Sequence, residues 1–457
     1  MMKKNKFLIM IFTAAAGFVI NTFQAYAAIG VTGDVSVKNQ TGIHEGDIYR
    51  NYLKADVVFN ESFENTEVKV ILRGEEDSLR PDEGEENYGY YLRDDRGSKR
   101  VYLREAYISH DIYFESYIDS VNIKMGRLIY TWGTSDEVKP VDIINPQDYS
   151  NLYFTPIRER KYGVISGAMS VFITENFFIE GVAVPEFRPS EMASSVFVTN
   201  QMLEISGNAG LYTLNDPVLP EEKISGSSYA GRAGLTVLDV DMHANYFYGY
   251  DKLPVYEMEL TAGPGIIITP EYKQIQMIGF DFQRALLWGI SVRGEVAYFE
   301  RGKFFIYDSS SPSGNILLSP LAVDLSNGGN GTVEKDYIEY TAGFDDQNFI
   351  FDDLYLNLQF HQKIIRGYED GLAKEQYTNL VIWNIRYSMV NQKYRVSSQG
   401  AYDIGDKSVY GNAEFMVKMA DNFELALGGW FIEGDEDTDI GQFDENDIVY
   451  VSGKLTF

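Results

Sequence analysis

The sequence predicts a transmembrane antiparallel β-barrel of about eighteen strands, and three observations support this prediction. The chain begins with a leader for export, apolar and polar residues alternate in many segments, and the last residue is aromatic. Composition agrees, because tyrosine (33), phenylalanine (28) and glycine (41) are frequent whereas proline (13) is not. The mature chain also lacks an apolar stretch long enough for a transmembrane helix.

Residues 1–27 form the predicted signal peptide. Three lysines precede residues 7–20, which carry no charge, and Ala25 and Ala27 supply the small-x-small pattern that signal peptidase reads. A retained membrane anchor is the alternative, but the apolar run is short for a spanning helix. We therefore expect residues 28–457 to form one barrel domain, integral to the cell outer membrane.

The absence of cysteine and the net charge exclude several classes of function. With no cysteine, the chain has no disulfides, thiolate metal sites or cysteine nucleophiles. A net charge of −28 argues against nucleic-acid binding, which requires clustered Lys and Arg. No cofactor is expected.

Alternation with a period of two is the main indication of strands. In the segment 422–431, Phe423, Leu425 and Leu427 share one face, while Glu424 falls on the other. A soluble sandwich would alternate too. The membrane is favoured because the segments have the length of tilted membrane strands and their polar faces carry charges, as a wall facing water would.

The predicted strands follow from this alternation and from the turn residues between them. They are 29–38, 49–60, 65–74, 99–110, 118–131, 160–172, 176–186, 227–237, 240–250, 271–284, 288–300, 336–347, 352–362, 377–390, 393–403, 408–419, 422–432 and 447–457. In 118–131, Arg127 falls on the face of Ile123 and Met125, so we expect a β-bulge near Gly126.

The connections between these strands alternate between short and long. Short turns are expected near 61–64, 111–117, 173–175, 238–239, 285–286, 349–351, 391–392 and 420–421. Long connections are expected at 75–98, 132–158, 187–225, 251–270, 301–335, 363–375 and 433–446. Outer-membrane barrels place short turns in the periplasm and long loops outside, so both termini are expected in the periplasm.

The C-terminus resembles the terminal strand that the barrel-assembly machinery recognises. Val451, Gly453, Leu455 and Phe457 alternate with polar residues and finish on an aromatic ring. The expected partners are this machinery, at Phe457, together with outer-membrane lipid and lipopolysaccharide.

A barrel of this size has a lumen too wide for side chains alone to fill. The segment 132–161 combines Asp and Asn with Pro, which favours fixed turns, and Trp132 requires a buried face. One interpretation is a loop that enters the lumen and constricts the pore; the other is a rigid cap over the barrel mouth. In the first, positive charge comes from Arg127, Lys139, Arg158, Arg160 and Lys161.

Charges on the polar strand faces are expected to line the lumen. The basic ones are Lys54, Lys69, Arg73, Arg232, Arg293, Lys363, Arg386, Arg395, Lys418 and Lys454. The acidic ones are Asp34, Asp56, Glu180, Asp241, Glu295, Glu339, Glu414 and Glu424. Mixed signs fit a salt-bridged wall as well as a selectivity filter, and Arg293 and Glu295 are candidate pore residues.

A set of residues between about 100 and 300 carries a family resemblance. It comprises Gly126, Arg127, Trp132, Gly133, Asp136, Pro140, Asp142, Asn145, Pro146, Asp148, Glu159, Arg160, Lys161, Ile179-Glu180-Gly181, Pro185-Glu186-Phe187, Tyr248, Gly249, Tyr250, Asp251, Pro254, Pro270, Tyr272, Gly279, Asp281, Arg293-Gly294-Glu295 and Ala297-Tyr298. The pattern resembles a family of proteobacterial outer-membrane barrels of unassigned function, related to alginate-export porins. The resemblance implies transport without fixing a substrate, and the acidic loops depart from the basic tendency of alginate channels.

Negative charge is concentrated in two long connections, 75–98 and 433–446. Asp435, Asp437 and Asp439 begin like a calcium loop, but the sixth position is Ile440 rather than glycine. Weak divalent-cation binding is one interpretation, and a solvated, repulsive surface is the other.

These features predict a porin-like channel for passive passage or export of a solute, which is a small molecule or a polymer. One alternative is a surface adhesion or structural barrel whose acidic loops meet partners. The other is a hydrolase in the barrel wall, although no nucleophile motif accompanies the four histidines. The sequence thus predicts a protein that is not an enzyme.

Overall fold

A computed structural model describes most of the chain from residue 30 onward. The described residues are 30–43, 48–79, 98–115, 117–192, 212–221, 223–261, 265–286, 289–305, 324–325, 327–369, 372, 374–436 and 438–457. The predicted signal peptide lies outside these residues.

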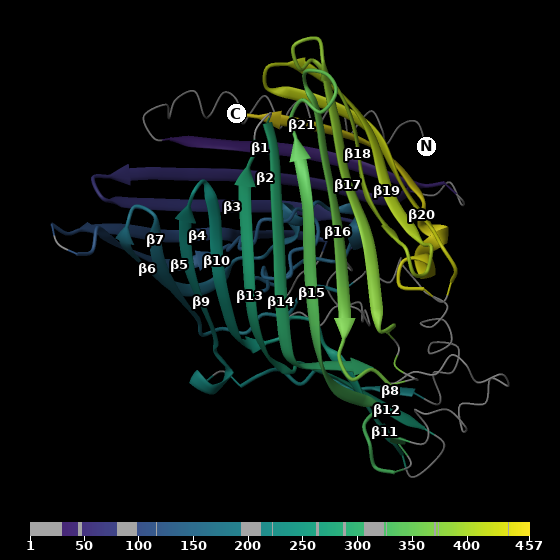
Figure 1. The fold of residues 1–457 in the computed structure, drawn as a ribbon. Helices are drawn as coiled ribbons and strands as arrows, with labels where there is room; N and C mark the ends of the chain where they lie inside the picture. Colours follow the sequence, from purple (N-terminus) through teal and green to yellow (C-terminus); the bar gives the residue numbers. More distant parts are fainter. Residues whose placement is uncertain are drawn as a thin grey trace.

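Eighteen antiparallel strands form one sheet, which confirms the predicted number (Figure 1). They are β1 (Val31–Gly42), β2 (Ile48–Phe63), β3 (Thr66–Asp77), β4 (Lys99–Tyr113), β5 (Ser120–Leu128), β6 (Val164–Thr174), β7 (Phe177–Val184), β9 (Ser228–Val237), β10 (Val240–Tyr250), β13 (Gln274–Ala285), β14 (Ile290–Phe305), β15 (Thr332–Asp346), β16 (Leu354–Ile365), β17 (Tyr377–Met389), β18 (Tyr394–Asp403), β19 (Val409–Ala420), β20 (Phe423–Glu433) and β21 (Ile448–Thr456). Each predicted strand overlaps one of them.

The sheet closes because the first strand pairs with the last. β1 pairs with β2 on one side and with β21 on the other, and the second ladder runs from Asp34 opposite Thr456 to Gly42 opposite Ile448. The final residue extends this ladder, since the backbone of Phe457 exchanges hydrogen bonds of 2.8 and 3.0 Å with Gly33. Closure leaves no unpaired strand edge, as a barrel in lipid requires.

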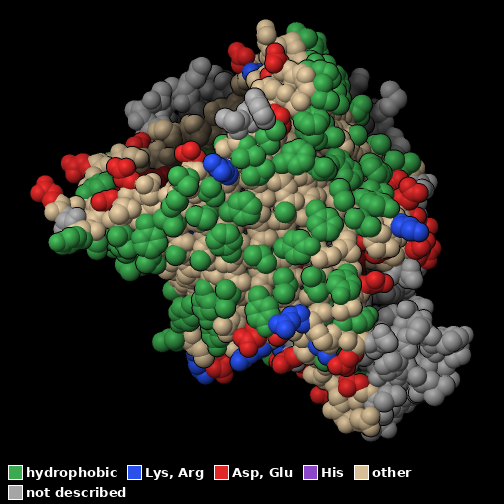
Figure 2. All heavy atoms as spheres, viewed as in Figure 1, with side chains coloured by type: hydrophobic (Ala, Val, Ile, Leu, Met, Phe, Trp, Pro, Cys, Tyr) green, Lys and Arg blue, Asp and Glu red, His purple; other side chains and the backbone are tan. Residues whose placement is uncertain are grey.

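The outer face of the barrel is an apolar belt. Figure 2 shows hydrophobic side chains over the strands and most charged side chains toward the strand ends. Large apolar residues exposed on this face include Val101, Leu103, Ile108, Met125, Ile165, Met169, Ile179, Ile278, Phe280, Val296, Leu358, Ile385, Val396, Phe415, Leu425, Leu427, Val449 and Val451. Such a belt with polar rims is the surface that a membrane-spanning barrel presents to lipid.

Short and long connections alternate along the chain, as predicted. Most turns at one end are tight, for example those between β2 and β3 and between β19 and β20. The other end carries the long connections, including a small sheet of β8 (Tyr212–Leu214), β11 (Val255–Leu260) and β12 (Ile266–Glu271). None of the helices among the described residues is both long enough and apolar enough to cross a membrane.

The bulge expected near Gly126 lies on the neighbouring strand instead. β5 keeps a continuous register with both β4 and β6 through Gly126. The extra residue is Arg104 of β4, because Ile71 and Leu72 of β3 pair with Glu105 and Leu103. Gly126 has a φ of +140°, and a Cβ there would lie 2.2 Å from the Ala106 carbonyl oxygen. The glycine therefore allows close approach of β4 rather than an inserted residue.

We predict that Phe457→Asp lowers the amount of folded barrel in outer membranes. The Phe457 ring covers Gly33, where a Cβ would lie 2.7 Å from Cζ, so a carboxylate would break the apolar closure at the seam. Heat-modifiable mobility in gel electrophoresis measures the folded fraction. Phe457→Tyr keeps the ring and is the control; equal folding of both variants would contradict the prediction.

Candidate functional site

The long connection between β5 and β6, residues 129–163, lies against the inward-facing side chains of the barrel. We call it the lumen loop. Trp132 and Val141 are buried, and Val141 lies against Gly279 on β13, where a Cβ would meet its Cγ1 at 2.6 Å. A segment that leaves the barrel between β5 and β6 thus packs on strands across the lumen.

Glu295 of β14 holds the tip of this loop. Its carboxylate accepts hydrogen bonds from the backbone N–H groups of Thr134, at 2.6 Å, and Ser135. Gly133 makes this approach possible, because its φ is +80° and a Cβ there would lie 2.6 Å from the carboxylate oxygens. Hydrogen bonds to an ionised carboxylate are stronger than those between neutral groups, so Glu295 is the principal anchor of the tip.

The neighbouring strands add three further attachments. Arg293 Nη1 donates to the Thr134 carbonyl at 2.8 Å. Gln359 of β16 accepts from the Asp136 N–H at 3.3 Å, and the Thr341 hydroxyl of β15 donates to the Val138 carbonyl at 3.4 Å. The tip is therefore bonded to three consecutive strands of one wall.

The returning half of the loop attaches to the other walls. Lys54 Nζ of β2 lies 3.1 Å from Glu159 Oε2, and the ring of Phe154 lies 5.4 Å from the ring of Trp430 on β20. Burial acts to raise the pKa of Glu159, but Lys54 and other cations outweigh it and lower that pKa to about 2. The ion pair between Glu159 and Lys54 is thus fully present at pH values above the usual glutamate pKa, and it is lost only as the pH falls through about 2.

Asn145 fixes the fold of the loop itself. Its Oδ1 accepts from the Tyr130 N–H at 2.7 Å, and its Nδ2 donates to the carbonyls of Leu128 and Tyr162 at 2.9 and 2.8 Å. One amide therefore ties the start of the loop to its end. Pro140 and Pro146, which flank Asn145 in the sequence, are buried. Asp148 accepts a hydrogen bond from the Tyr162 hydroxyl at 2.9 Å.

Asp142 and Lys161 form a buried ion pair within the loop. Lys161 Nζ also donates to the Tyr130 carbonyl at 2.8 Å, and Asp142 accepts from the Trp132 N–H at 3.4 Å. Burial raises the pKa of Asp142 and lowers that of Lys161, while their mutual attraction opposes both shifts. Together with these two backbone contacts, the pair holds Tyr130 and Trp132, where the tip begins, close to Asp142, where it ends.

The five cations predicted to supply positive charge do not form one ring. Arg160 is buried and paired with Glu137, and Lys161 is paired with Asp142. Arg158 is exposed and Lys139 is partly buried. Arg127 lies on the outer face of the wall, beside Ile165 in the register, and donates to the Gly163 carbonyl at 2.8 Å.

The wall charges form ion pairs across strands. Arg73 and Asp56 are joined by two bonds of 2.7 and 2.6 Å. Other pairs are Lys69 with Glu105 at 3.0 Å, Lys363 with Glu339 at 3.2 Å, Arg395 with Glu414 at 3.6 Å, and Arg293 with Asp345. The arrangement is that of a salt-bridged wall. Gln359 and Thr341 were not singled out in the sequence, although alternation places Gln359 on a polar face.

The remaining predicted sites lie elsewhere. Asp437 is outside the described residues, and Asp439 is paired with Lys374. Among the residues that the structure describes, no three His, Asp or Glu side chains are grouped as metal ligands. The three described histidines contact Thr66, Asp281 and Thr341, so no Ser–His pair occurs there.

Comparison with known proteins identifies a family. The model of one family, described as "Protein of unknown function (DUF1302)", matches residues 23–424. No protein with a curated description matches the chain.

Solved structures of outer-membrane barrels resemble this one distantly. Wzi of Escherichia coli, described as a carbohydrate-binding β-barrel, has a TM-score of 0.46 and 12% identity, covering 96% of this chain and 87% of its own. OprB of Pseudomonas putida has a TM-score of 0.46 and 11% identity over 93% and 94% of the two chains. OccAB3 of Acinetobacter baumannii has a TM-score of 0.46 and 12% identity over 94% and 99%. Likeness at this level carries no argument about function.

We predict that Glu295→Gln loosens the tip of the lumen loop. The N–H groups of Thr134 and Ser135 both donate to Oε1, and the Val141 nitrogen lies 3.5 Å from Oε2. The amide leaves only a neutral acceptor for the first two donors, whereas bonds to a charged acceptor contribute about 1.5–3 kcal/mol each, and its NH2 group opposes the Val141 N–H. Hydrogen–deuterium exchange of peptides covering 132–142 should be about tenfold faster or more. Glu339→Gln, which removes a wall charge that is paired with Lys363 rather than with the tip, is the control. Unchanged exchange in the Glu295 variant would show that the carboxylate is not the anchor.

Proposed function

The chain belongs to the DUF1302 family, and we propose that it is a passive outer-membrane channel whose width is set by the lumen loop. One observation carries the proposal: residues 129–163 leave one wall of an eighteen-stranded barrel and bond to side chains of β2, β14, β15 and β16 inside it. Eighteen strands enclose a lumen that side chains do not fill, so the loop determines how much of the cross-section stays open.

The attachments make this constriction a fixed one. Two charged anchors, Glu295 and Lys54, hold the loop from separate strands, and Phe154 packs on Trp430 between them. A solute would pass between the loop and the wall without displacing a folded domain. Since most wall charges are paired, the constriction exerts a weak net field on ions.

The apolar belt and the leader support an outer-membrane location. The belt covers the strands and the charges gather at their ends (Figure 2). The end with long connections is proposed to face the outside and the end with tight turns the periplasm, the arrangement of outer-membrane barrels.

Replacing residues 133–141 with a short Gly-Ser linker should raise single-channel conductance several-fold. The cut is feasible because the Trp132 N–H lies 3.4 Å from Asp142 Oδ1, so a short linker spans the gap. Planar-bilayer recording in KCl measures the change.

The matched control replaces residues 435–439, because Gly434 and Gly441 lie together there: a Cβ on Gly434 would be 3.0 Å from the Gly441 Cα. It keeps Ile440, which is buried in the same cluster as Leu152 and Phe154 of the lumen loop. Asp439, in the replaced segment, is paired with Lys374 rather than with the lumen loop, so the conductance of this variant should match wild type. Equal conductance in all three proteins would place the constriction elsewhere, and no conductance in any of them would refute the channel.

Cysteine labelling tests the orientation, because the chain has no cysteine of its own. Ser78→Cys and Thr438→Cys, at the end with long connections, should react on intact cells with a reagent that does not cross membranes. Asp421→Cys, in a tight turn at the opposite end, is the control and should react only after lysis. The reverse labelling pattern would show that the barrel has the opposite orientation in the membrane.

A further inference from the structure

A row of four amide side chains crosses adjacent strands on the lumen side of the wall. The strand register places Asn357 of β16 opposite Asn384 of β17, Asn384 opposite Gln399 of β18, and Gln399 opposite Asn412 of β19. Residues directly opposite each other in an antiparallel pair share a face, so the four amides form a continuous row. We call it the amide row.

Three of these amides form no hydrogen bond of normal geometry among the described residues. Asn357 is 0% exposed, and apart from an interaction with the Tyr355 side chain neither its Oδ1 nor its Nδ2 has a partner there. Asn384 and Gln399 likewise form no side-chain hydrogen bond there, whereas Asn412 donates to the Gly429 carbonyl and the Tyr450 hydroxyl. Buried polar groups in folded proteins are nearly always satisfied, so the amide of Asn357 calls for a further partner. Asn384 and Gln399 are partly exposed, so their amides are available to a partner that is not the protein itself.

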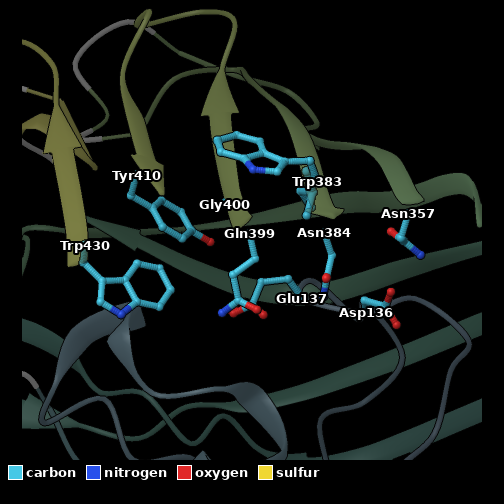
Figure 3. A pocket seen from close by; sticks show the side chains of 10 residues that line it. Asp136, Glu137, Asn357, Trp383, Asn384, Gln399, Gly400, Tyr410 and Trp430 are labelled. Carbon is cyan, nitrogen blue, oxygen red and sulfur yellow. The ribbon is translucent and has the colours of Figure 1, made fainter. Parts of the chain in front are cut away.

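The tip of the lumen loop faces this row across a narrow gap. Figure 3 shows the amides of Asn384 and Gln399 extending from their strands toward Glu137. The gap is lined by Asn357, Asn384 and Gln399 of the row, by Asp136 and Glu137, and by Tyr410 and Trp430. Its volume is about 20 Å³, which admits a water-sized group.

Each carboxylate beside the gap already contacts an arginine. Asp136 lies 3.4 Å from Arg293, which also pairs with Asp345, and Glu137 is paired with Arg160. No Lys or Arg lines the gap itself. A cation would therefore find only carboxylates that arginines already hold, and an anion would find no cation within the gap.

We propose that the amide row binds the hydroxyl groups of a neutral saccharide, an assignment that rests on the proposed channel function. A primary amide both donates and accepts hydrogen bonds, as a hydroxyl group does. The indole N–H of Trp430, whose ring is stacked on that of Tyr410, is a further buried donor without an acceptor among the described residues. The small gap accepts single hydroxyl groups, so the row holds one edge of the solute.

The experiment combines binding and conductance. The probes are neutral linear oligosaccharides with α- and β-linkages, and uronate oligosaccharides of equal length as the charged comparison. Tryptophan fluorescence of the detergent-solubilised protein reports binding near Trp430, and interruptions of the bilayer current report binding in the open channel. We expect a neutral oligosaccharide to produce both effects, and uronates to bind more weakly.

Substitution assigns the binding to the row. The double variant Asn384→Leu, Gln399→Leu removes two hydrogen-bonding groups at similar volume and should weaken binding about tenfold or more. Gln283→Leu, which removes a lumen-side amide of β13 outside the row, is the control and should bind as wild type does. Heat-modifiable mobility shows that each variant is folded.

The outcomes separate the two proposals. A wild-type protein that conducts KCl but responds to no neutral oligosaccharide in either assay would refute the saccharide site and leave the channel standing. Binding without conductance would refute the channel and leave the site. Uronates that bind as tightly as neutral probes, or equal binding by the double variant and wild type, would overturn the assignment to the amide row.

Discussion

The pairing of β1 with β21 is the constraint on which the rest of the structure depends. Backbone N–H and C=O groups left unpaired in lipid cost several kcal/mol each, so the sheet must close on itself. Closure with eighteen strands sets the circumference of the barrel, and the wall side chains cannot fill a lumen of that width. The lumen loop follows from that width, because a segment that enters the barrel supplies the packing that the wall alone lacks.

Packing a polar loop inside a barrel requires that its buried charges be compensated. Lys161 pairs with Asp142 within the loop, and Glu159 pairs with Lys54 of the wall. Removing one member of a buried pair leaves the other charge uncompensated, at about 3–5 kcal/mol. The same pairs that hold the loop therefore also neutralise it.

The strands were predictable because alternation is a local property, and every predicted strand overlaps an observed one. The lumen-facing position of Glu295 also follows from alternation. Its contacts were not predictable, because its partners Thr134 and Ser135 lie about 160 residues earlier in the chain. Arg127 illustrates the opposite case. Alternation placed Arg127 on the same outer face as Met125, and the bulge expected near Gly126 would have turned its side chain inward. The bulge lies instead on β4, where Arg104 is the extra residue. No local sequence pattern reveals the register of that strand.

The lumen thus contains two kinds of polar group with different capacities. Paired charges, such as Arg293 with Asp345, have most of their hydrogen-bonding capacity occupied and present little net field to a passing ion. Asn384 and Gln399, which are not engaged in that way among the described residues, retain theirs. Net negative charge is instead concentrated in the acidic stretch 433–446, toward one end of the barrel. If the proposed channel function holds, charge acts at the mouth, and discrimination at the constriction depends on hydrogen bonding. A neutral solute rich in hydroxyl groups exchanges its bonds with water for bonds with amides there, whereas an ion would lose hydration without gaining a counter-charge.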